Sequence, residues 1–463
     1  MRKIALYVAL LFAGNFVSAQ QALTPEALKT LEESYQNDRT DKAIRNAVNA
    51  NSIKKLAANR EHTADADMEF TYKVKSSGIT DQKSSGRCWL FTGTNVLRSQ
   101  LMARTGMKNF QFSTVYTFFY DQLEKSNLFL QGIIDTREKP LDDKMVEWLF
   151  RHPLSDGGQF TGVSDLIGKY GLVPREVMAE TYSSDNTSEF SALLKNKLRE
   201  GGMSLRAAAE KGASVKELER QKMDLMKVVY RMLVYAYGEP PASFTWAPKV
   251  NGKYAGKPKT YTPQSFYKEI CGGEDLNANY VMLMNDPSRP YHKVYEIDYD
   301  RHTYDGHNWL YVNLPVEDIK AMAVASLKDS TMMYFSCDVG KFLNPKDGTL
   351  DLDNYDYASL FGTTFSMDKK QRIQSFDSGS THAMTLMAVD LDESGKPERW
   401  MVENSWGADY GAQGHLVMTD RWFDEYMFRV VVHKKYCPQS VLDLLKQEPV
   451  RLPAWDPMFQ NEL

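Results

Sequence analysis

The chain has 463 residues, with 56 Lys and Arg against 60 Asp and Glu and a formal net charge of −4. This length exceeds what one hydrophobic core usually holds, so two lobes, or one domain with large insertions, are expected. The apolar content of 43% and charged content of 25% are typical of a soluble globular protein. The near balance of charge gives no general argument for nucleic acid or an acidic membrane as a partner.

The first 19 residues differ from the rest. Arg2 and Lys3 precede an apolar run over Ile4–Ala13, and the small residues Val17-Ser18-Ala19 follow. This pattern is typical of a secretory signal peptide that is cleaved after residue 19, and the apolar run is too short to span a membrane. We therefore expect an exported protein, periplasmic or extracellular, without a membrane span.

The four cysteines are Cys88, Cys271, Cys337 and Cys437. They are too few for a disulfide scaffold in an exported chain of this length, and their spacing matches no zinc signature. If Cys88 stays free, the other three form at most one bridge. His302, Asp305 and His307 lie close together in sequence, but we interpret their loop as polar rather than as a metal site. No metal or cofactor is expected.

Helical spacing of apolar residues dominates the first half of the chain. Thr24-Pro25-Glu26 predicts the start of a short helix, and Asp38–Asp67 is interpreted as a polar arm or linker. Further helices are expected at Ser113–Ser126, Asp142–Arg151, Gly162–Tyr170, 188–236 with an interruption at Gly201-Gly202, and Pro263–Ile270.

The last third of the chain reads instead as strands separated by turn residues. One helix, Pro315–Ser326, is expected among them. The predicted strands are Val294–Tyr299, Leu310–Leu314, Met332–Asp338, His382–Asp390, Arg399–Glu403, His415–Thr419 and Phe428–His433. Helices in the first half and strands in the last third, without regular alternation, predict an α+β protein with a cleft between two lobes.

One stretch, Gly78–Arg98, places Cys88 directly before an apolar helical run, so this thiol should lie in the first turn of a helix. Free backbone N–H groups and the helix dipole favour an anion there, and the thiolate is the nucleophilic form. Gln82, six residues upstream, is placed to donate a side-chain N–H to an oxyanion. Taken alone, the stretch fits a small buried structural cysteine equally well.

A nucleophilic cysteine needs a base, and His382 is the candidate among eight histidines, at the start of an apolar strand. Asn404 follows the strand Arg399–Glu403, and a hairpin would place it beside His382. Its oxygen could then accept from one ring nitrogen and aim the other at the sulfur, while Trp406 covers that bond from water. Taken alone, His382 is explained as a structural histidine at the end of a strand, and Asn404 as a turn residue. Together with Gln82 and Cys88 they favour catalysis.

At this point the chain resembles a known family. The runs QKSSGRCWLF, STHAM and VENSWG are similar to the three active-site motifs of papain-like cysteine peptidases. FFYDQLEKSN, GGQ, KYGLVP, GEPP, WFDEY and PAWDPM are similar to the bleomycin hydrolase and aminopeptidase C branch, from about residue 65 to the C-terminus.

The resemblance implies a papain-like two-lobed fold, with a helical lobe, a β-barrel-like lobe, a helical insertion and a C-terminal arm. It implies a cysteine aminopeptidase in which Cys88 is the nucleophile, His382 the base and acid, Asn404 the orienting group and Gln82 the oxyanion donor. Trp89 and Trp406 would support them.

The resemblance also implies a homohexamer that acts on peptides with a free N-terminus, whose amine is held by the arm near Met458. The implied division is 1–19 signal peptide, 20–67 helix and arm, 68–180 helical lobe, 181–280 insertion, 281–450 β-rich lobe and 451–463 arm. Two features depart from the family, which is usually cytosolic and has a shorter tail. We expect the residues after Met458 to reach deeper into the cleft or to be trimmed.

Two other functions remain open from the sequence. A papain-like endopeptidase would use the same four residues with an open cleft. A nucleic-acid-binding or assembly role would need a local stripe of Lys and Arg, which the net charge of −4 does not favour.

Overall fold

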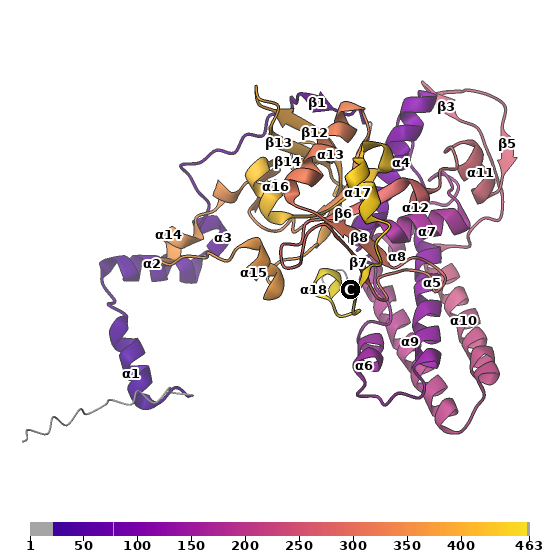
Figure 1. Ribbon diagram of the computed structural model, residues 1–463, viewed down its shortest axis with the longest axis horizontal. Helices are drawn as coiled ribbons and strands as arrows, with labels where there is room; N and C mark the ends of the chain where they lie inside the picture. Colours follow the sequence, from indigo (N-terminus) through magenta and orange to yellow (C-terminus); the bar gives the residue numbers. More distant parts are fainter. Residues whose placement is uncertain (1–21, 77, 461–463) are drawn as a thin grey trace, which may run out of the picture. The chain divides into compact units, whose positions relative to one another are not determined.

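The computed structural model describes residues 22–76 and 78–460, so the expected signal peptide, residues 1–19, lies outside the described residues. The chain divides into two compact units (Figure 1). One contains the residues up to Ala58 together with Asp356–Thr364. The other contains Asn59–Tyr355 and the chain from Phe365 onward.

The smaller unit is helical, and none of the residues in its helices is buried. The helices are α1 (Pro25–Ser34), α2 (Arg39–Ala50), α3 (Ile53–Leu56) and α14 (Tyr357–Phe361). The stretch Asp38–Asp67, interpreted as a polar arm or linker, carries the helices α2 and α3 in its first part, which were not predicted from the sequence. The Asp38 side chain accepts from the backbone of Asp41 and caps α2, a signal that the polar composition obscured.

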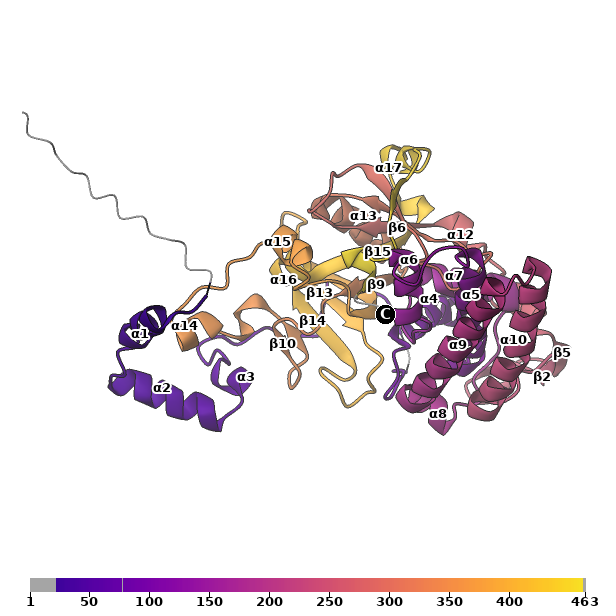
Figure 2. The same cartoon turned by 90° about the horizontal axis from the view of Figure 1, so that it is seen from below.

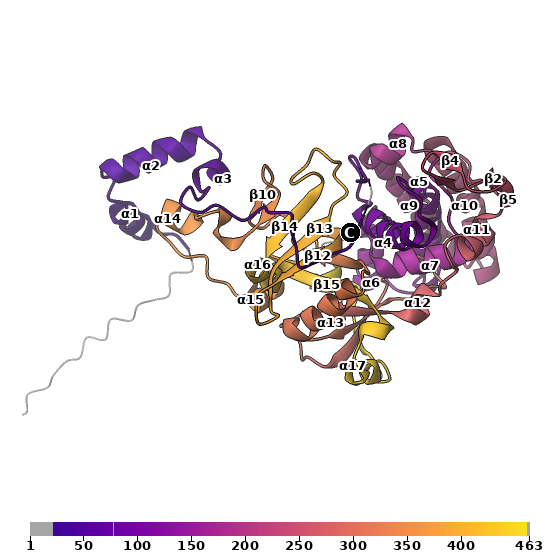
Figure 3. The same ribbon diagram turned by 90° about the horizontal axis from the view of Figure 1, so that it is seen from above.

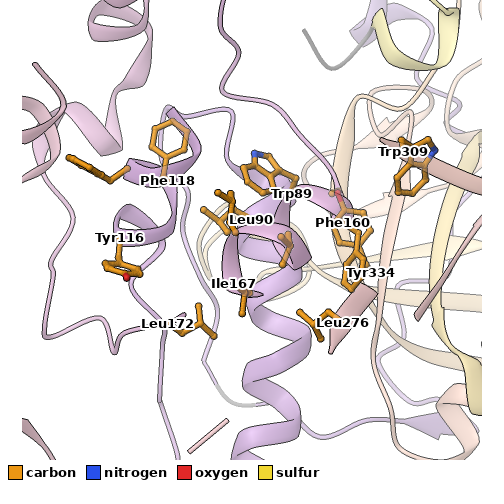
Figure 4. Packing of buried hydrophobic residues seen from close by; sticks show 14 of the residues in the cluster. Trp89, Leu90, Tyr116, Phe118, Phe160, Ile167, Leu172, Leu276, Trp309 and Tyr334 are labelled. Atoms are coloured by element: carbon orange, nitrogen blue, oxygen red, sulfur yellow. The ribbon is translucent and has the colours of Figure 1, made fainter. Parts of the chain in front are cut away.

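The helical part of the larger unit is built around α4 (Cys88–Thr105), most of whose residues are buried. It packs against α5 (Thr114–Asp135) and α7 (Phe160–Tyr170), while α6 (Lys144–Arg151) lies on α5. Figure 4 shows Trp89 and Leu90 of α4 among side chains from α5, α7 and the sheet. A helix buried on all sides lacks an amphipathic stripe, and α4 follows that rule.

The insertion contains α8 (Tyr182–Asp185), α9 (Thr187–Glu210) and α10 (Val215–Tyr237), and the two long helices run side by side in Figure 2. The predicted interruption at Gly201-Gly202 was wrong, because α9 continues through both. A Cβ atom on Gly201 would lie 2.9 Å from the Leu225 side chain, and one on Gly202 would lie 3.1 Å from the Phe129 ring. These glycines allow close helix packing, and the turn falls at Gly212 instead.

Short elements connect the insertion to the sheet. They are β2 (Phe244–Trp246), β3 (Lys249–Val250), β4 (Lys253–Tyr254), β5 (Lys259–Tyr261), α11 (Pro263–Glu269) and α12 (Leu276–Asn279). β2 pairs with β5 and β3 with β4, each pair antiparallel.

Twelve strands of the described chain form one mixed sheet in the order β10-β11-β14-β13-β12-β9-β15-β6-β8-β7-β16, with β1 paired to β12. They are β1 (Tyr72–Lys73), β6 (Tyr280–Met284), β7 (Lys293–Ile297), β8 (Trp309–Asn313), β9 (Met333–Cys337), β10 (Leu343–Asn344), β11 (Thr349–Leu350), β12 (His382–Leu391), β13 (Pro397–Glu403), β14 (His415–Thr419), β15 (Met427–His433) and β16 (Val450–Leu452). Figure 3 shows β12, β13 and β14 side by side. Each of the seven predicted strands is present, and the fold is α+β.

Further helices accompany the sheet, and α13 packs on β12 and β15. They are α13 (Val316–Lys328), α15 (Lys369–Gln374), α16 (Asp420–Tyr426), α17 (Gln439–Leu444) and α18 (Pro457–Gln460), with 3₁₀ turns at Leu352–Asn354 and Lys434–Tyr436. Within the described residues, no helix combines the length and the apolar character that crossing a membrane requires.

Candidate active site

Cys88 is the first residue of α4, where the sequence predicted it. Burial raises the pKa of its thiol, while the backbone N–H groups of Ala383, Trp89 and Cys88 itself oppose that rise. Two of these N–H groups belong to the first turn of α4, whose dipole favours negative charge at this end. The sulfur therefore lies at a site prepared for an anion, and Cys88 remains partly exposed.

The loop before Cys88 is fixed by a buried ion pair. Arg87 is fully buried, and its guanidinium donates to the Glu180 carboxylate at 2.6 Å. The same carboxylate accepts from the Thr114 hydroxyl and the Val115 backbone at the start of α5. Burial raises the pKa of Glu180, but Arg87 and these hydrogen bonds outweigh it and hold the pKa below its ordinary value. The starts of α4 and α5 are thus locked together.

His382 begins β12, and Asn404 follows β13, the antiparallel neighbour of β12 in the sheet. Their side chains meet with 2.8 Å between the His382 Nε2 and Asn404 Oδ1 atoms. The Asn404 oxygen also accepts from the Ser405 backbone N–H at 2.8 Å, which fixes the amide. Because Nε2 donates to Asn404, the Nδ1 atom of His382 is left as the basic nitrogen.

Burial lowers the pKa of His382 to about 4, and the hydrogen bond to Asn404 opposes that change only in part. Trp406 stacks on the imidazole with 4.5 Å between ring centroids and 28° between ring planes. Tyr410 in turn packs edge-on against Trp406 at 4.7 Å. The Trp406 ring, supported by Tyr410, therefore covers the imidazole, and this burial is the cause of the lowered pKa.

The Gln82 side chain is held at both ends of its amide. Its Oε1 atom accepts from the Ser405 hydroxyl at 2.7 Å, and its Nε2 atom donates to the Ser85 carbonyl at 2.6 Å. An amide nitrogen carries two hydrogens, so one N–H remains for another acceptor. Ser405 thus links Gln82 to Asn404, its neighbour in the chain. The sequence motifs gave no sign of this contact, because it depends on packing between the lobes.

A cleft of about 600 Å³ brings these groups together, since Gln82, Cys88, His382 and Trp406 all line it. Asn404 lies behind His382, and Trp89, the second residue of α4, has no exposed surface. The Trp89 indole N–H donates to the Asp156 carbonyl at 2.8 Å, which holds the loop carrying Gly157 and Gly158 against the cleft.

The histidines of the polar loop have separate partners. His302 is buried, and its Nδ1 atom lies 2.5 Å from the Asp121 carboxylate, which also pairs with Lys125 at 3.1 Å. His307 pairs instead with Asp165 at 2.7 Å. A side chain on Gly158 would collide with the His302 ring, so His302 shapes the loop at the edge of the cleft.

The described part of the C-terminal arm ends beside the loop that carries Gly157 and Gly158. β16 pairs in parallel with β7, and Met458 is buried with its carbonyl accepting from Arg429 at 2.6 Å. Phe459 packs on Trp148 of α6 at 5.8 Å between centroids, and Figure 1 shows α18 next to α6. Phe459 lines a cavity that shares Ser155, Gly157 and Gly158 with the cleft. Met458 does not line the cleft.

The fold and the arrangement of the cleft are those of a papain-like cysteine peptidase. The model of the Peptidase C1-like family matches residues 22–459, and the chain belongs to that family.

Similar proteins extend over nearly the whole chain. Bleomycin hydrolase of Homo sapiens is 36% identical over 450 residues, covering 95% of this chain and 99% of its own. Aminopeptidase C of Lactobacillus delbrueckii subsp. lactis is 37% identical over 418 residues, covering 89% and 92%. The crystal structure of PepW from Lactobacillus rhamnosis HN001 (DR20) superposes with a TM-score of 0.89 at 35% identity, covering 95% of this chain and 99% of that chain.

Proposed function

We propose that this protein is a cysteine aminopeptidase that releases N-terminal residues from peptides through an acyl-enzyme intermediate. The observation that carries the proposal is the cleft itself. Cys88 opens α4 on one side, and the hydrogen-bonded pair of His382 and Asn404 faces the same cleft from the sheet.

The first step is proton transfer from Cys88 to the Nδ1 atom of His382. Burial opposes an isolated charge on either group, because it raises the pKa of the thiol and lowers that of the imidazole. The two charges can therefore form only together, each stabilising the other, with Asn404 accepting from the imidazolium and α4 facing the thiolate. Trp406 keeps water from weakening the pair.

The thiolate then attacks the scissile carbonyl, whose oxygen becomes an oxyanion. The backbone N–H of Cys88 and the remaining N–H of Gln82 are the donors for it, each worth about 3 kcal/mol in comparable enzymes. His382 protonates the leaving amine, and the bond from carbon to nitrogen breaks. Water, deprotonated by His382, then attacks the thioester and releases the N-terminal residue with regeneration of the thiol.

The position of the arm favours removal of residues from the N-terminus over cleavage inside chains. Phe459 and the cleft share the Ser155–Gly158 loop, so the described arm ends where the acyl side of a long substrate would continue. The relatives named aminopeptidase C, W and G agree with this assignment. Hydrolysis of alanyl-peptide substrates, compared with their N-acetylated counterparts, tests it. Activity on the acetylated substrates alone would favour the endopeptidase.

The same proposal includes self-association into a homohexamer. The smaller unit supports it, because Leu28, Leu31, Ile44 and Ile53 are exposed apolar residues on helices without buried residues. Exposed apolar side chains on helices that bury nothing within the chain favour a contact with another chain. Light scattering of the purified protein should give about six times the chain mass, and a monomer would contradict this part.

Export remains part of the proposal and rests on residues 1–19 alone. N-terminal sequencing of protein from the periplasm or culture medium should start at Gln20. Protein that retains Met1 and stays in the cytosol would contradict export without affecting the enzymatic assignment.

A further inference from the structure

One wall of the cleft comes from the insertion rather than from the two lobes that carry the catalytic groups. Ser188, Ser191, Ala192 and Lys195 of α9 all line the cleft. Their spacing of three, four and seven residues puts them on one face of the helix. A substrate bound in the cleft would therefore contact this face of α9.

The position of this wall relative to Cys88 is fixed by Asp156. The Asp156 carboxylate accepts from the Ser191 hydroxyl at 2.7 Å and from the Thr187 hydroxyl, both on α9. It also accepts from the backbone of Gly86, two residues before Cys88, at 3.4 Å. The start of α9 is thus tied to the loop that presents the sulfur.

Lys195 is the charged side chain of this wall that is free to pair with a group of the substrate. Asp156 also lines the cleft, but both of its oxygens already accept hydrogen bonds from α9 and from Gly86. Lys195 is partly exposed and makes no hydrogen bond or ion pair within the described ranges 22–76 and 78–460. The charge of Lys195 also acts on His152, whose pKa is lowered by burial and then by the positive charges of Lys195, Arg151 and Arg199. The α9 wall of the cleft therefore carries the positive charge of Lys195, while Asp156 is engaged by its own hydrogen bonds.

The reaction geometry decides which part of a substrate meets this charge. His382 must protonate the leaving amine, so the released peptide lies against His382 and Trp406. The acyl part, which carries the N-terminal residue, extends the other way, toward Gly86, Asp156 and Gly157. The α9 wall stands on that side.

We propose that the α9 face is the pocket for the side chain of the N-terminal residue and that Lys195 makes it selective for acidic side chains. This inference rests on the proposed aminopeptidase function. A carboxylate of Glu or Asp would pair with the free ammonium, whereas Lys or Arg would be repelled. A partly exposed pair of this kind is worth about a fivefold preference.

The test compares kcat/KM for glutamyl, glutaminyl and lysyl derivatives of 7-amino-4-methylcoumarin, since Glu and Gln differ little in shape. The wild type should prefer glutamyl over glutaminyl substrate by about fivefold, mainly through KM, and less at high salt. Lys195→Gln should bring the ratio close to one, and Lys195→Glu should favour the lysyl substrate. Lys197→Gln is the matched control, because Lys197 is two positions along α9 and already paired with Glu200 at 2.7 Å.

The outcomes separate this inference from the function on which it rests. An active wild type whose ratio of glutamyl to glutaminyl turnover is unchanged in both Lys195 variants would overturn the role of Lys195 alone. A wild type that releases no N-terminal residue from any of the three substrates would overturn the proposed function as well.

Discussion

The two walls that carry the catalytic groups hold them by different means. On the sheet, His382 and Asn404 meet because adjacent antiparallel strands end at the same edge, so backbone register alone brings them within 2.8 Å. On the helical side, Cys88 depends on side chains distant in sequence, above all the buried pair of Arg87 and Glu180. The sheet should therefore tolerate side-chain changes that the helical wall cannot, while the chemistry should be sensitive on both.

Removing the sulfur is expected to have the largest effect. Cys88→Ala should reduce kcat by about 10⁴-fold or more, because no other group can form the acyl-enzyme. Its thermal midpoint should stay close to that of the wild type, since the thiol only lines the cleft. Cys271→Ala, outside the cleft, is the control and should keep its activity. Equal turnover by Cys88→Ala and the wild type would refute the assignment.

Removing the ion pair between Arg87 and Glu180 on the helical wall should lower the stability of the fold. Arg87→Met leaves the Glu180 carboxylate buried without its cation, which should lower the free energy of unfolding by about 3–5 kcal/mol in denaturant titrations. Arg137→Met removes an exposed pair with Glu138 and should cost less than about 1 kcal/mol. An equal loss of unfolding free energy in both variants would contradict the claim that the Arg87–Glu180 pair stabilises the helical wall more than an exposed pair does.

On the sheet side, removing the orienting amide should affect catalysis more than stability. Asn404→Ala frees the His382 ring to rotate, and misalignment of this kind costs about 10²-fold in kcat/KM. Asn344→Ala changes an asparagine at the end of β10 that lies outside the cleft, so its kcat/KM should match the wild type. Wild-type kcat/KM in the Asn404 variant would show that strand packing alone orients the histidine.

Alanine substitutions at two glycines, Gly93 and Gly168, test how tightly the helical wall is packed. A Cβ atom on Gly93 of α4 would lie 2.6 Å from the Val163 side chain of α7, so Gly93→Ala should cost about 1–3 kcal/mol of stability. Gly168 of α7 has no atom within 4 Å of its Cβ position, and Gly168→Ala should stabilise by about 0.5–1 kcal/mol. Changes of the same sign in the two variants would contradict this difference in packing.

The smallest effect concerns pH. The folded pKa of His382 is lowered to about 4 from an ordinary 6.5, so the base stays unprotonated as the pH falls through 6.5. The acid limb of kcat, measured at saturating substrate, should therefore have its midpoint below 6.5. A midpoint at or above 6.5 would mean that water reaches the imidazole despite Trp406.

The same contrast explains what could be predicted from the sequence. The pairing of His382 with Asn404 followed from two strand patterns and a hairpin, and the helix start at Cys88 followed from local spacing. The contacts of Ser405 with Gln82, of Arg87 with Glu180 and of α9 with Asp156 join segments far apart in the chain. No local pattern encodes them, because they depend on how the helices pack. For the same reason Gly201 looked like a helix breaker when it is a packing site.

The most direct test of the central claim is alkylation of the reduced wild type with limiting iodoacetamide, followed by activity and by peptide mass spectrometry. Burial raises the pKa of all four thiols, to about 12 for Cys271 and about 11 for Cys437, but of the four only Cys88 lines the cleft, where His382 can take its proton. Aminopeptidase activity should fall in proportion to the label on Cys88, with the other three cysteines unmodified. Full activity in protein labelled at Cys88 would contradict the account.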